Sequence, residues 1–240
     1  PEYCGGLKTQ GSTFAPPSAP EESHPVLNGL RVFAKDKSRF VLIGSIAIDG
    51  PENKILNRSF LIDNDGNIVS RYDKIHLFDI NLSEQQSYCE SATVRGGNDA
   101  VLCQTPFAKM GQTVCYDLRF PNLYRELSQS GAEVLFVPAA FTKKTGEAHW
   151  HVLNRARAIE NGAFVVAPCA IGEVEGGGAS YGHSLIINPW GEVLADGGVQ
   201  VGVVSAVIDL DEVTTARQRI PSLSHDKPFA TKQSTGLVAK

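Results

Sequence analysis

The sequence lacks the features that mark several specialised classes of protein. It has no basic excess, because 22 Lys and Arg stand against 26 Asp and Glu, a net charge of −4. A mildly acidic chain without a run of Lys or Arg argues against nucleic-acid and membrane-surface partners. No apolar run approaches the roughly 20 residues that cross a bilayer, and no basic-then-apolar leader precedes the fold. We therefore expect a cytoplasmic protein without nucleic-acid or membrane partners.

Cysteine is scarce, and its spacing excludes the common paired sites. None of the five cysteines forms a CxxC pair, and no HxxxH pattern occurs among the six histidines. A disulfide framework and a structural zinc site are both disfavoured, which makes a zinc or redox protein a remote alternative. Free thiols in a reducing compartment are the simpler interpretation, and we expect no metal. The cysteines are Cys4, Cys89, Cys103, Cys115 and Cys169.

The chain does contain an ordinary share of hydrophobic residues, 42%, arranged as alternating strands and helices. β-Branched runs predict strands, and apolar stripes at helical spacing predict helices. Hairpins mixed with βαβ units indicate one domain over residues 1–240, with mixed sheets and helices outside them. The predicted strands are 40–48, 59–62, 68–72, 111–115, 134–137, 164–167, 184–187 and 202–208, and the predicted helices are near 23–34, 121–131 and 148–160, with a short helix after 208.

The remaining segments are expected to be irregular or to end these elements. The first 22 residues and the polar stretch 79–99 are predicted as loops, and the glycines 176–178 as a hairpin tip. Gly162 is expected to end the longest helix. The apolar residues of that helix that we expect to face inward are Val152, Leu153, Ala156 and Ile159.

Cys115 is the most informative residue for function. It ends an apolar strand and precedes a tight segment and a helix that Pro121 opens. A nucleophile at a strand-to-helix turn is exposed, and the next backbone N–H groups face the place where an oxyanion forms. Taken alone, Cys115 fits a buried core cysteine better. Lys74, at the end of another strand, has the positive charge that activates a thiol, although an exposed charge is the commoner interpretation.

Other residues are weaker candidates. Glu2 and Glu90 are the carboxylates considered as a general base, while His76 and His183 are alternatives that a structural histidine explains better. Asp117 and Arg119 flank the Cys115 turn, and we expect them to form an ion pair that holds the loop. A substrate-carboxylate role for Arg119 is the second choice.

Four segments, in this order, resemble the nitrilase superfamily of carbon–nitrogen hydrolases. Residues 71–77 (RYDKIHL) are similar to its lysine motif, and 114–121 (VCYDLRFP) to its nucleophile motif. Residues 149–150 and 155–161 (HW, RARAIEN) resemble its long helix, and 181–184 with 188–191 (YGHS, NPWG) its late hairpin. The Tyr116-Asp117 pair resembles the amidase branch, in particular the Nit amidases that hydrolyse ω-amides of α-keto acids or deaminated glutathione.

The resemblance implies a fold and a set of site residues. The fold is a four-layer αββα sandwich, and the site is a Glu–Lys–Cys triad with a second glutamate. Lys74 and Cys115 match the family motifs directly, Glu2 matches the glutamate of a Pro-Glu pair, and Glu90 matches the second glutamate. Family members have a strand, a helix and a strand before Pro-Glu, so we expect the 240 residues to lack this N-terminal part of one domain.

The predicted activity is hydrolysis of a small carboxamide by water through a cysteine thioester, without a cofactor. Glu2 is the predicted base, Lys74 and the Tyr116 N–H hold the oxyanion, and Glu90 orients Lys74 or the water. The residues predicted to line the substrate pocket are Tyr116, Phe78, Phe141, Thr142 and His149. The resemblance also implies a homodimer or larger homo-oligomer, assembled through the helix 148–160. The alternatives are a nitrilase, a carbamoylase or an aliphatic amidase of the same family, and a non-catalytic binding protein with the same fold.

Overall fold

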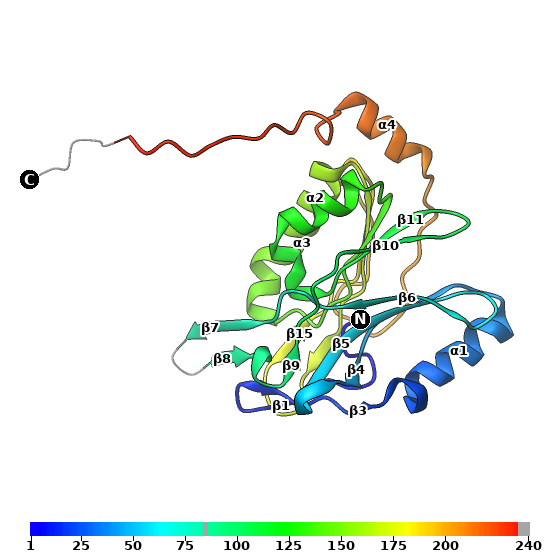
Figure 1. The fold of residues 1–240 in the computed structure, drawn as a ribbon, viewed down its shortest axis with the longest axis vertical. Coiled ribbons are helices and arrows are strands. Elements are labelled where there is room, and N and C mark those ends of the chain that lie inside the picture. The colour runs from blue at the N-terminus through cyan, green and yellow to red at the C-terminus, as the bar shows by residue number, and fades with distance from the viewer. Residues whose placement is uncertain (84–85, 235–240) are drawn as a thin grey trace, which may run out of the picture.

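Two β-sheets form the centre of the computed structural model, which describes residues 1–83 and 86–234 (Figure 1). The first sheet has the order β3-β4-β5-β6, and β9 pairs with β5. Its strands are β3 (Ser18–Ala19), β4 (Val41–Asp49), β5 (Ile55–Ile62), β6 (Ile68–Asp73) and β9 (Val94–Arg95). The second sheet has the order β10-β11-β12-β13-β16-β17. Its strands are β10 (Val101–Gln104), β11 (Lys109–Gln112), β12 (Val134–Phe136), β13 (Phe164–Ala167), β16 (Leu185–Ile187) and β17 (Val193–Asp196).

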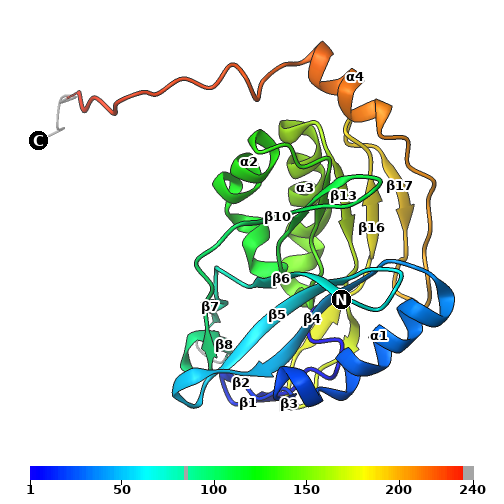
Figure 2. The ribbon, with the colours of Figure 1, turned by 45° about the vertical axis from the view of Figure 1, so that its right-hand side comes forward.

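Helices cover the outer face of each sheet, as Figure 2 shows. Helix α1 (Pro25–Lys37) packs on the first sheet through a core that includes Leu27 and Phe60. Helices α2 (Pro121–Gln129) and α3 (Lys143–Asn161) cover the second sheet. Between the sheets, Leu61 of β5 meets Met110 and Phe164 of the second sheet in a separate apolar cluster. The layers are therefore α, β, β and α, which confirms the predicted sandwich.

Three small ladders lie outside the two sheets. They pair β1 (Thr9–Gln10) with β2 (Thr13–Phe14), β7 (Asp79–Ser83) with β8 (Gln86–Cys89), and β14 (Ile171–Glu173) with β15 (Ala179–Tyr181). The first 22 residues and the stretch 79–99, both predicted to be loops, thus contain short strands. Their apolar residues are too few to give a periodic signal, so pairing partners distant in sequence decide their conformation. A last helix, α4 (Asp211–Arg219), follows the second sheet and leads into a C-terminal segment that extends away from the body (Figure 1).

Helix α3 differs from the predicted long helix in its first residue and in the face that it buries. It begins at Lys143 after Thr142, five residues before the predicted start, and ends as predicted at Gly162, which has a left-handed φ of 52°. The predicted inward face is wrong for Val152 and Ile159, which are 67% and 51% exposed, whereas Leu153 packs against the core as predicted. The buried face is partly polar, and its residues are Thr145, Gly146, Trp150, Asn154, Arg157, Ala158 and Asn161.

The predicted strand 202–208 is absent from the described residues. This segment has no ladder partner, and Val201, Val203 and Val207 are at least 92% exposed. An alternating valine pattern favours an extended chain, but a strand also needs a neighbour that satisfies its backbone groups. Among the described residues, no helix has both the length and the hydropathy needed to cross a bilayer.

Candidate active site

Two buried carboxylates flank one buried ammonium group at the centre of the candidate site. The Nζ atom of Lys74 lies 2.8 Å from Oε1 of Glu2 and 2.8 Å from Oε2 of Glu90. The three side chains are at most 5% exposed. Lys74 directly follows β6, Glu90 opens the short helix η3 (Glu90–Ala92), and Glu2 lies at the N-terminal end of the chain. Segments distant in sequence thus bring three predicted charged residues to one place, and Glu2 and Lys74 line the same cavity as Cys115.

Charge pairing decides the protonation of this centre. Burial alone would lower the pKa of Lys74, but the carboxylates of Glu2 and Glu90 outweigh it and hold that pKa well above its usual range. Burial would likewise raise the pKa of Glu2, but the charge of Lys74 and hydrogen bonds from Lys74, Cys115 and Asn57 keep it below its usual value. The ammonium group and the Glu2 carboxylate are therefore both charged near neutral pH.

Several groups that the sequence analysis missed hold the two carboxylates in place. Nδ2 of Asn57 donates to Oε1 of Glu2 at 2.9 Å and to Oε1 of Glu90 at 3.1 Å. The hydroxyl of Tyr3 donates to Glu90 at 3.2 Å, and the backbone N–H of Phe78 donates to Glu90 at 2.6 Å. Oε2 of Glu2 accepts from the backbone N–H of Ala140 at 3.0 Å. Asn57 lies within an apolar strand pattern, and nothing in that pattern singled it out.

Cys115 occupies the first position of the short helix η4 (Cys115–Arg119), with a left-handed φ of 48°. This conformation is uncommon for a residue other than glycine and is often found at functional sites. The backbone N–H of Cys115 donates to the Pro138 carbonyl at 2.9 Å. Burial, together with the negative charge of Glu2, raises the pKa of the Cys115 thiol well above its usual value despite Lys74. Cys115 is therefore a protonated thiol at rest.

The backbone N–H of Tyr116 is available beside the thiol. The first N–H groups of a helix have no acceptor within the helix. In the described ranges, 1–83 and 86–234, no hydrogen bond from this N–H is found. It is therefore free to donate to an oxygen atom bound next to Cys115.

Asp117 organises the Cys115 turn, but not through the ion pair with Arg119 that the sequence suggested. Its fully buried carboxylate accepts from the Tyr72 hydroxyl at 2.6 Å, the Val114 N–H at 2.8 Å and the His76 N–H at 3.0 Å. The His76 ring also lies 2.7 Å from it. Arg119 lies at the surface instead, 3.3 Å from Nδ1 of His149.

The two histidines considered as bases have other partners. The ring of His76 contacts Asp117 and stacks on Phe120, with centroids 3.5 Å apart. His183 contacts Asp196 at 2.9 Å. Glu2, which lines the same cavity as Cys115, is thus the better placed base.

A cavity of about 530 Å³, counted with its open mouth, adjoins Cys115. Four of the predicted lining residues, Phe78, Tyr116, Phe141 and Thr142, do line it. The fifth, His149, does not: it is exposed on α3, facing Arg119. Residues that line the cavity and were not predicted include Leu7, Phe14, Tyr88, Thr145, Val174 and Ser180.

Lys74 also bears on whether this centre would hold a metal. Glu2 and Glu90 are the two carboxylates that contact Lys74, and the ammonium group occupies the place between them. A carboxylate pair that already has a buried cation partner needs no further positive charge. The donor set therefore fits a metal poorly.

Comparisons with known proteins show the family of the chain. Residues 6–218 match the family model described as carbon–nitrogen hydrolase. The chain is 42% identical over 207 residues to a deaminated glutathione amidase of Dictyostelium discoideum, a match covering 84% of this chain and 71% of that protein. It is 34% identical to the human omega-amidase NIT2, covering 88% of this chain and 76% of the relative.

A solved structure shows the same fold. The crystal structure of the C. elegans NitFhit protein superposes with a TM-score of 0.81 at 35% identity, covering 86% of this chain and 51% of that one. A family match over most of the chain, the sandwich fold and the shared names of the relatives point the same way. The chain therefore belongs to the carbon–nitrogen hydrolase family, the nitrilase superfamily, in its Nit-type amidase branch.

Proposed function

We propose that this chain hydrolyses a small carboxamide to a carboxylate and ammonia through a thioester on Cys115. The observation that carries the proposal is that Cys115, Glu2 and Lys74 line one cavity together, with Glu2 2.8 Å from the Lys74 ammonium group. A thiol, a base within hydrogen-bond reach and a fixed positive charge are what covalent acyl transfer requires. The amidase names of the relatives support the same reaction class.

The first half of the reaction forms the thioester. Glu2 takes the proton from Cys115, and the thiolate attacks the carbonyl carbon of the amide. The resulting oxyanion accepts hydrogen bonds from the Tyr116 N–H and from Lys74. When the C–N bond breaks, Glu2 gives its proton to the nitrogen and ammonia leaves.

The second half restores the enzyme. Glu2 takes a proton from water, and the hydroxide attacks the thioester carbonyl. The C–S bond breaks, the carboxylic acid is released, and the proton returns from Glu2 to the sulfur. Glu90 stays ionised and holds Lys74, with which it shares a 2.8 Å contact.

We expect the substrate to be an ω-amide of an α-keto acid or deaminated glutathione, as the names of the relatives suggest. The cavity supports a small acyl group with an apolar part, because Phe14, Phe78 and Phe141 line it. Arg119 lies over the rings of Tyr116 and Phe141, its guanidinium carbon 5.9 and 5.3 Å from their centroids. It is therefore placed at the cavity rim, where it would meet a substrate carboxylate.

The experiment is ammonia release measured with four substrates, for the wild type and for one variant. We expect turnover of α-ketoglutaramate or deaminated glutathione, and much less with a nitrile or an N-carbamoyl amino acid. Cys115→Ala should keep the fold, shown by an unchanged circular dichroism spectrum, and lose all turnover. Wild-type-like hydrolysis by Cys115→Ala would overturn the thioester mechanism. Preference for the nitrile or the carbamoyl compound would assign another branch, and no turnover of any substrate would favour a binding protein.

Assembly and location form part of the same proposal. The exposed Val152 and Ile159 of α3 lie on the helix that we expect to form a homodimer or larger assembly, and Trp190, 57% exposed, lies beside Ile159. Aromatic and aliphatic side chains gathered on one face favour an interface. All five cysteines are free thiols, which supports the reducing cytoplasm. Size-exclusion chromatography with light scattering of Val152→Asp against wild type tests the interface.

A further inference from the structure

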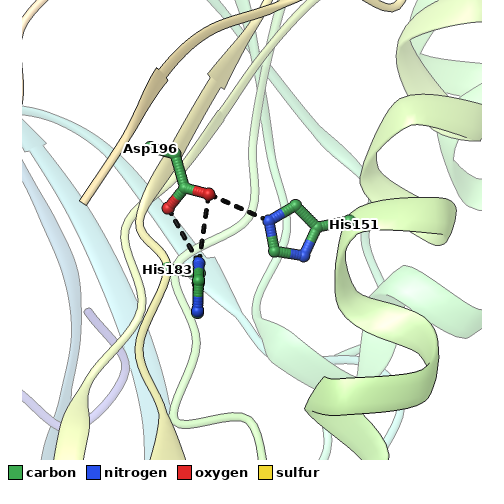
Figure 3. Close-up of side chains that lie close together, drawn as sticks. All are labelled: His151, His183 and Asp196. Carbon is green, nitrogen blue, oxygen red and sulfur yellow. Dashed lines mark hydrogen bonds and ion pairs between the residues drawn. The ribbon is translucent and has the colours of Figure 1, made fainter. Parts of the chain in front are cut away.

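Three side chains outside the candidate active site converge on one point of the surface (Figure 3). His151 comes from α3, His183 follows β15, and Asp196 ends β17. Oδ2 of Asp196 lies 3.1 Å from Nε2 of His151 and 3.0 Å from Nδ1 of His183, whereas Oδ1 lies 2.9 Å from His183. One ligand atom from each residue lies within 4.8 Å of the other two. We propose that His151, His183 and Asp196 bind a divalent transition-metal ion.

The residue types define the class of ion. Two imidazoles and one carboxylate suit Zn²⁺, Fe²⁺, Co²⁺ or Ni²⁺ better than Mg²⁺ or Ca²⁺, which prefer oxygen ligands. Three protein ligands leave at least one coordination position for water or another small ligand. Each of the three side chains is 24–34% exposed, so an ion can reach them from solvent.

The backbone fixes His183 before any ion binds. Its φ is 54°, in the left-handed region that few residues other than glycine adopt. Its N–H donates to the Gly198 carbonyl at 2.7 Å, and its carbonyl accepts from Nε1 of Trp150 at 2.7 Å. Trp150 is the neighbour of His151 on α3. The same contacts therefore tie the positions of two ligands together and lower the cost of ordering them.

Asp196 is likewise held as an acceptor. The Gly198 N–H donates to its Oδ1 at 2.8 Å. A ring nitrogen that ligates an ion carries no proton, so an ion bound here takes the place of the contacts between Asp196 and the two imidazoles.

The position of the cluster gives such an ion a structural effect near the cavity. The ring of Tyr181 stacks on His183, with centroids 4.7 Å apart, and the preceding Ala179 and Ser180 line the cavity beside Cys115. An ion held by His151, His183 and Asp196 would join α3, this strand and β17. The inference does not depend on the proposed amidase activity.

Direct binding measurements test the proposal. The full chain, treated with EDTA and dialysed, is titrated with Zn²⁺ by calorimetry, and with Co²⁺ while the visible spectrum is recorded. We expect one ion per chain and Co²⁺ bands without the intense charge-transfer absorption of thiolate ligands. His151→Ala, whose side chain lies at the helix surface, and Asp196→Ala should each weaken binding at least tenfold. The control His225→Ala removes an exposed histidine outside the cluster and should bind as wild type does.

Thermal unfolding is a second test, in which each folded protein is compared with and without Zn²⁺. Saturating Zn²⁺ should raise the melting temperature of wild type and of His225→Ala, and leave that of His151→Ala unchanged. No binding by the wild type would overturn the proposal. Binding that persists unchanged in both His151→Ala and Asp196→Ala would also overturn it, because the ion would then lie elsewhere.

Discussion

The hydroxyl of Tyr72 donates a 2.6 Å hydrogen bond to the buried carboxylate of Asp117, joining the end of β6 to the Cys115 turn. Tyr72 precedes Lys74 by two residues, and Asp117 follows Cys115 by two residues. The contact therefore fixes the strand that presents the ammonium group relative to the turn that presents the thiol. Burial, followed by the charge of Asp117, raises the pKa of Tyr72 well above its usual value, so the phenol remains a donor.

Replacing Tyr72 by Phe should loosen this link. A hydrogen bond to a buried charged group contributes about 1.5–3 kcal/mol, and Asp117 keeps its other donors. We expect a loss of unfolding free energy in that range and a kcat that falls more than KM changes, measured by urea unfolding and steady-state kinetics. Tyr124→Phe is the matched control, because its equally buried hydroxyl bonds to the neutral Thr113 at 2.7 Å. A larger loss for Tyr124→Phe than for Tyr72→Phe would contradict this account.

Removing the Lys74 ammonium group should destabilise the fold as well as abolish turnover. In Lys74→Met, the carboxylates of Glu2 and Glu90 lose their shared cation in a buried place. Breaking a buried pair in this way costs about 3–5 kcal/mol. Urea unfolding measures the loss, and Lys8→Met, at an exposed ion pair with Glu175, should change stability by less than about 0.5 kcal/mol. Equal stability of the two variants would show that the buried charges do not depend on Lys74.

The pKa shifts of the same groups predict the pH range of greatest stability. The pKa of Glu2 is lower in the folded state than its ordinary 4.5, so its contribution is present above pH 4.5 and is lost as the pH falls through the folded value. The pKa of Lys74 is higher than its ordinary 10.5, so its contribution is present below pH 10.5 and is lost as the pH rises through the folded value. The free energy of unfolding, measured with urea across pH, should fall on both the acid and the alkaline side of this range.

Glu2→Gln isolates the acid side of that profile. The difference in unfolding free energy between wild type and Glu2→Gln should be constant above pH 4.5 and shrink below it. A difference that stays constant down to pH 3 would contradict the lowered pKa of Glu2.

Two helix glycines should respond in opposite directions to alanine. A Cβ atom at Gly146 of α3 would overlap the ring of Tyr181, whereas one at Gly29 of α1 would meet nothing within 4 Å. Gly29→Ala should stabilise the protein by about 0.5–1 kcal/mol, because alanine has the higher helix propensity. Gly146→Ala should destabilise it and displace β15, which lines the cavity. The urea midpoints of both variants measure these changes in stability. Stabilisation by Gly146→Ala would contradict the packing described.

The layers of the sandwich could be predicted because strong local signals coincide with tertiary structure. The predicted strands 40–48, 59–62 and 68–72 correspond to β4, the second half of β5, and β6. The inward face of α3 could not be predicted from apolar spacing, since its buried face contains Asn154 and Arg157. Arg157 is satisfied there by the Leu118 carbonyl, at 2.7 Å from Nη2, a partner that lies 39 residues away.

In the candidate site, too, some residues could be predicted from the sequence and others could not. Motif order indicated Glu2, Lys74, Glu90 and Cys115, and the structure brings them together. Asn57, which donates to both carboxylates, could not be found, because a single asparagine in a strand has no local signature. The same holds for the carboxylate of Asp117, whose donors come from β6, from the residue before Cys115 and from the segment between Lys74 and Phe78.

The left-handed backbone at Cys115 limits which nucleophiles this scaffold can carry. A φ of 48° is tolerated by an unbranched side chain but strongly disfavours a second heavy atom on Cβ. Serine can therefore replace the cysteine without moving the chain, whereas threonine would have to rebuild the turn. Directed evolution from this fold can thus explore thiol and primary alcohol chemistry at residue 115, and secondary alcohol chemistry would need a different loop.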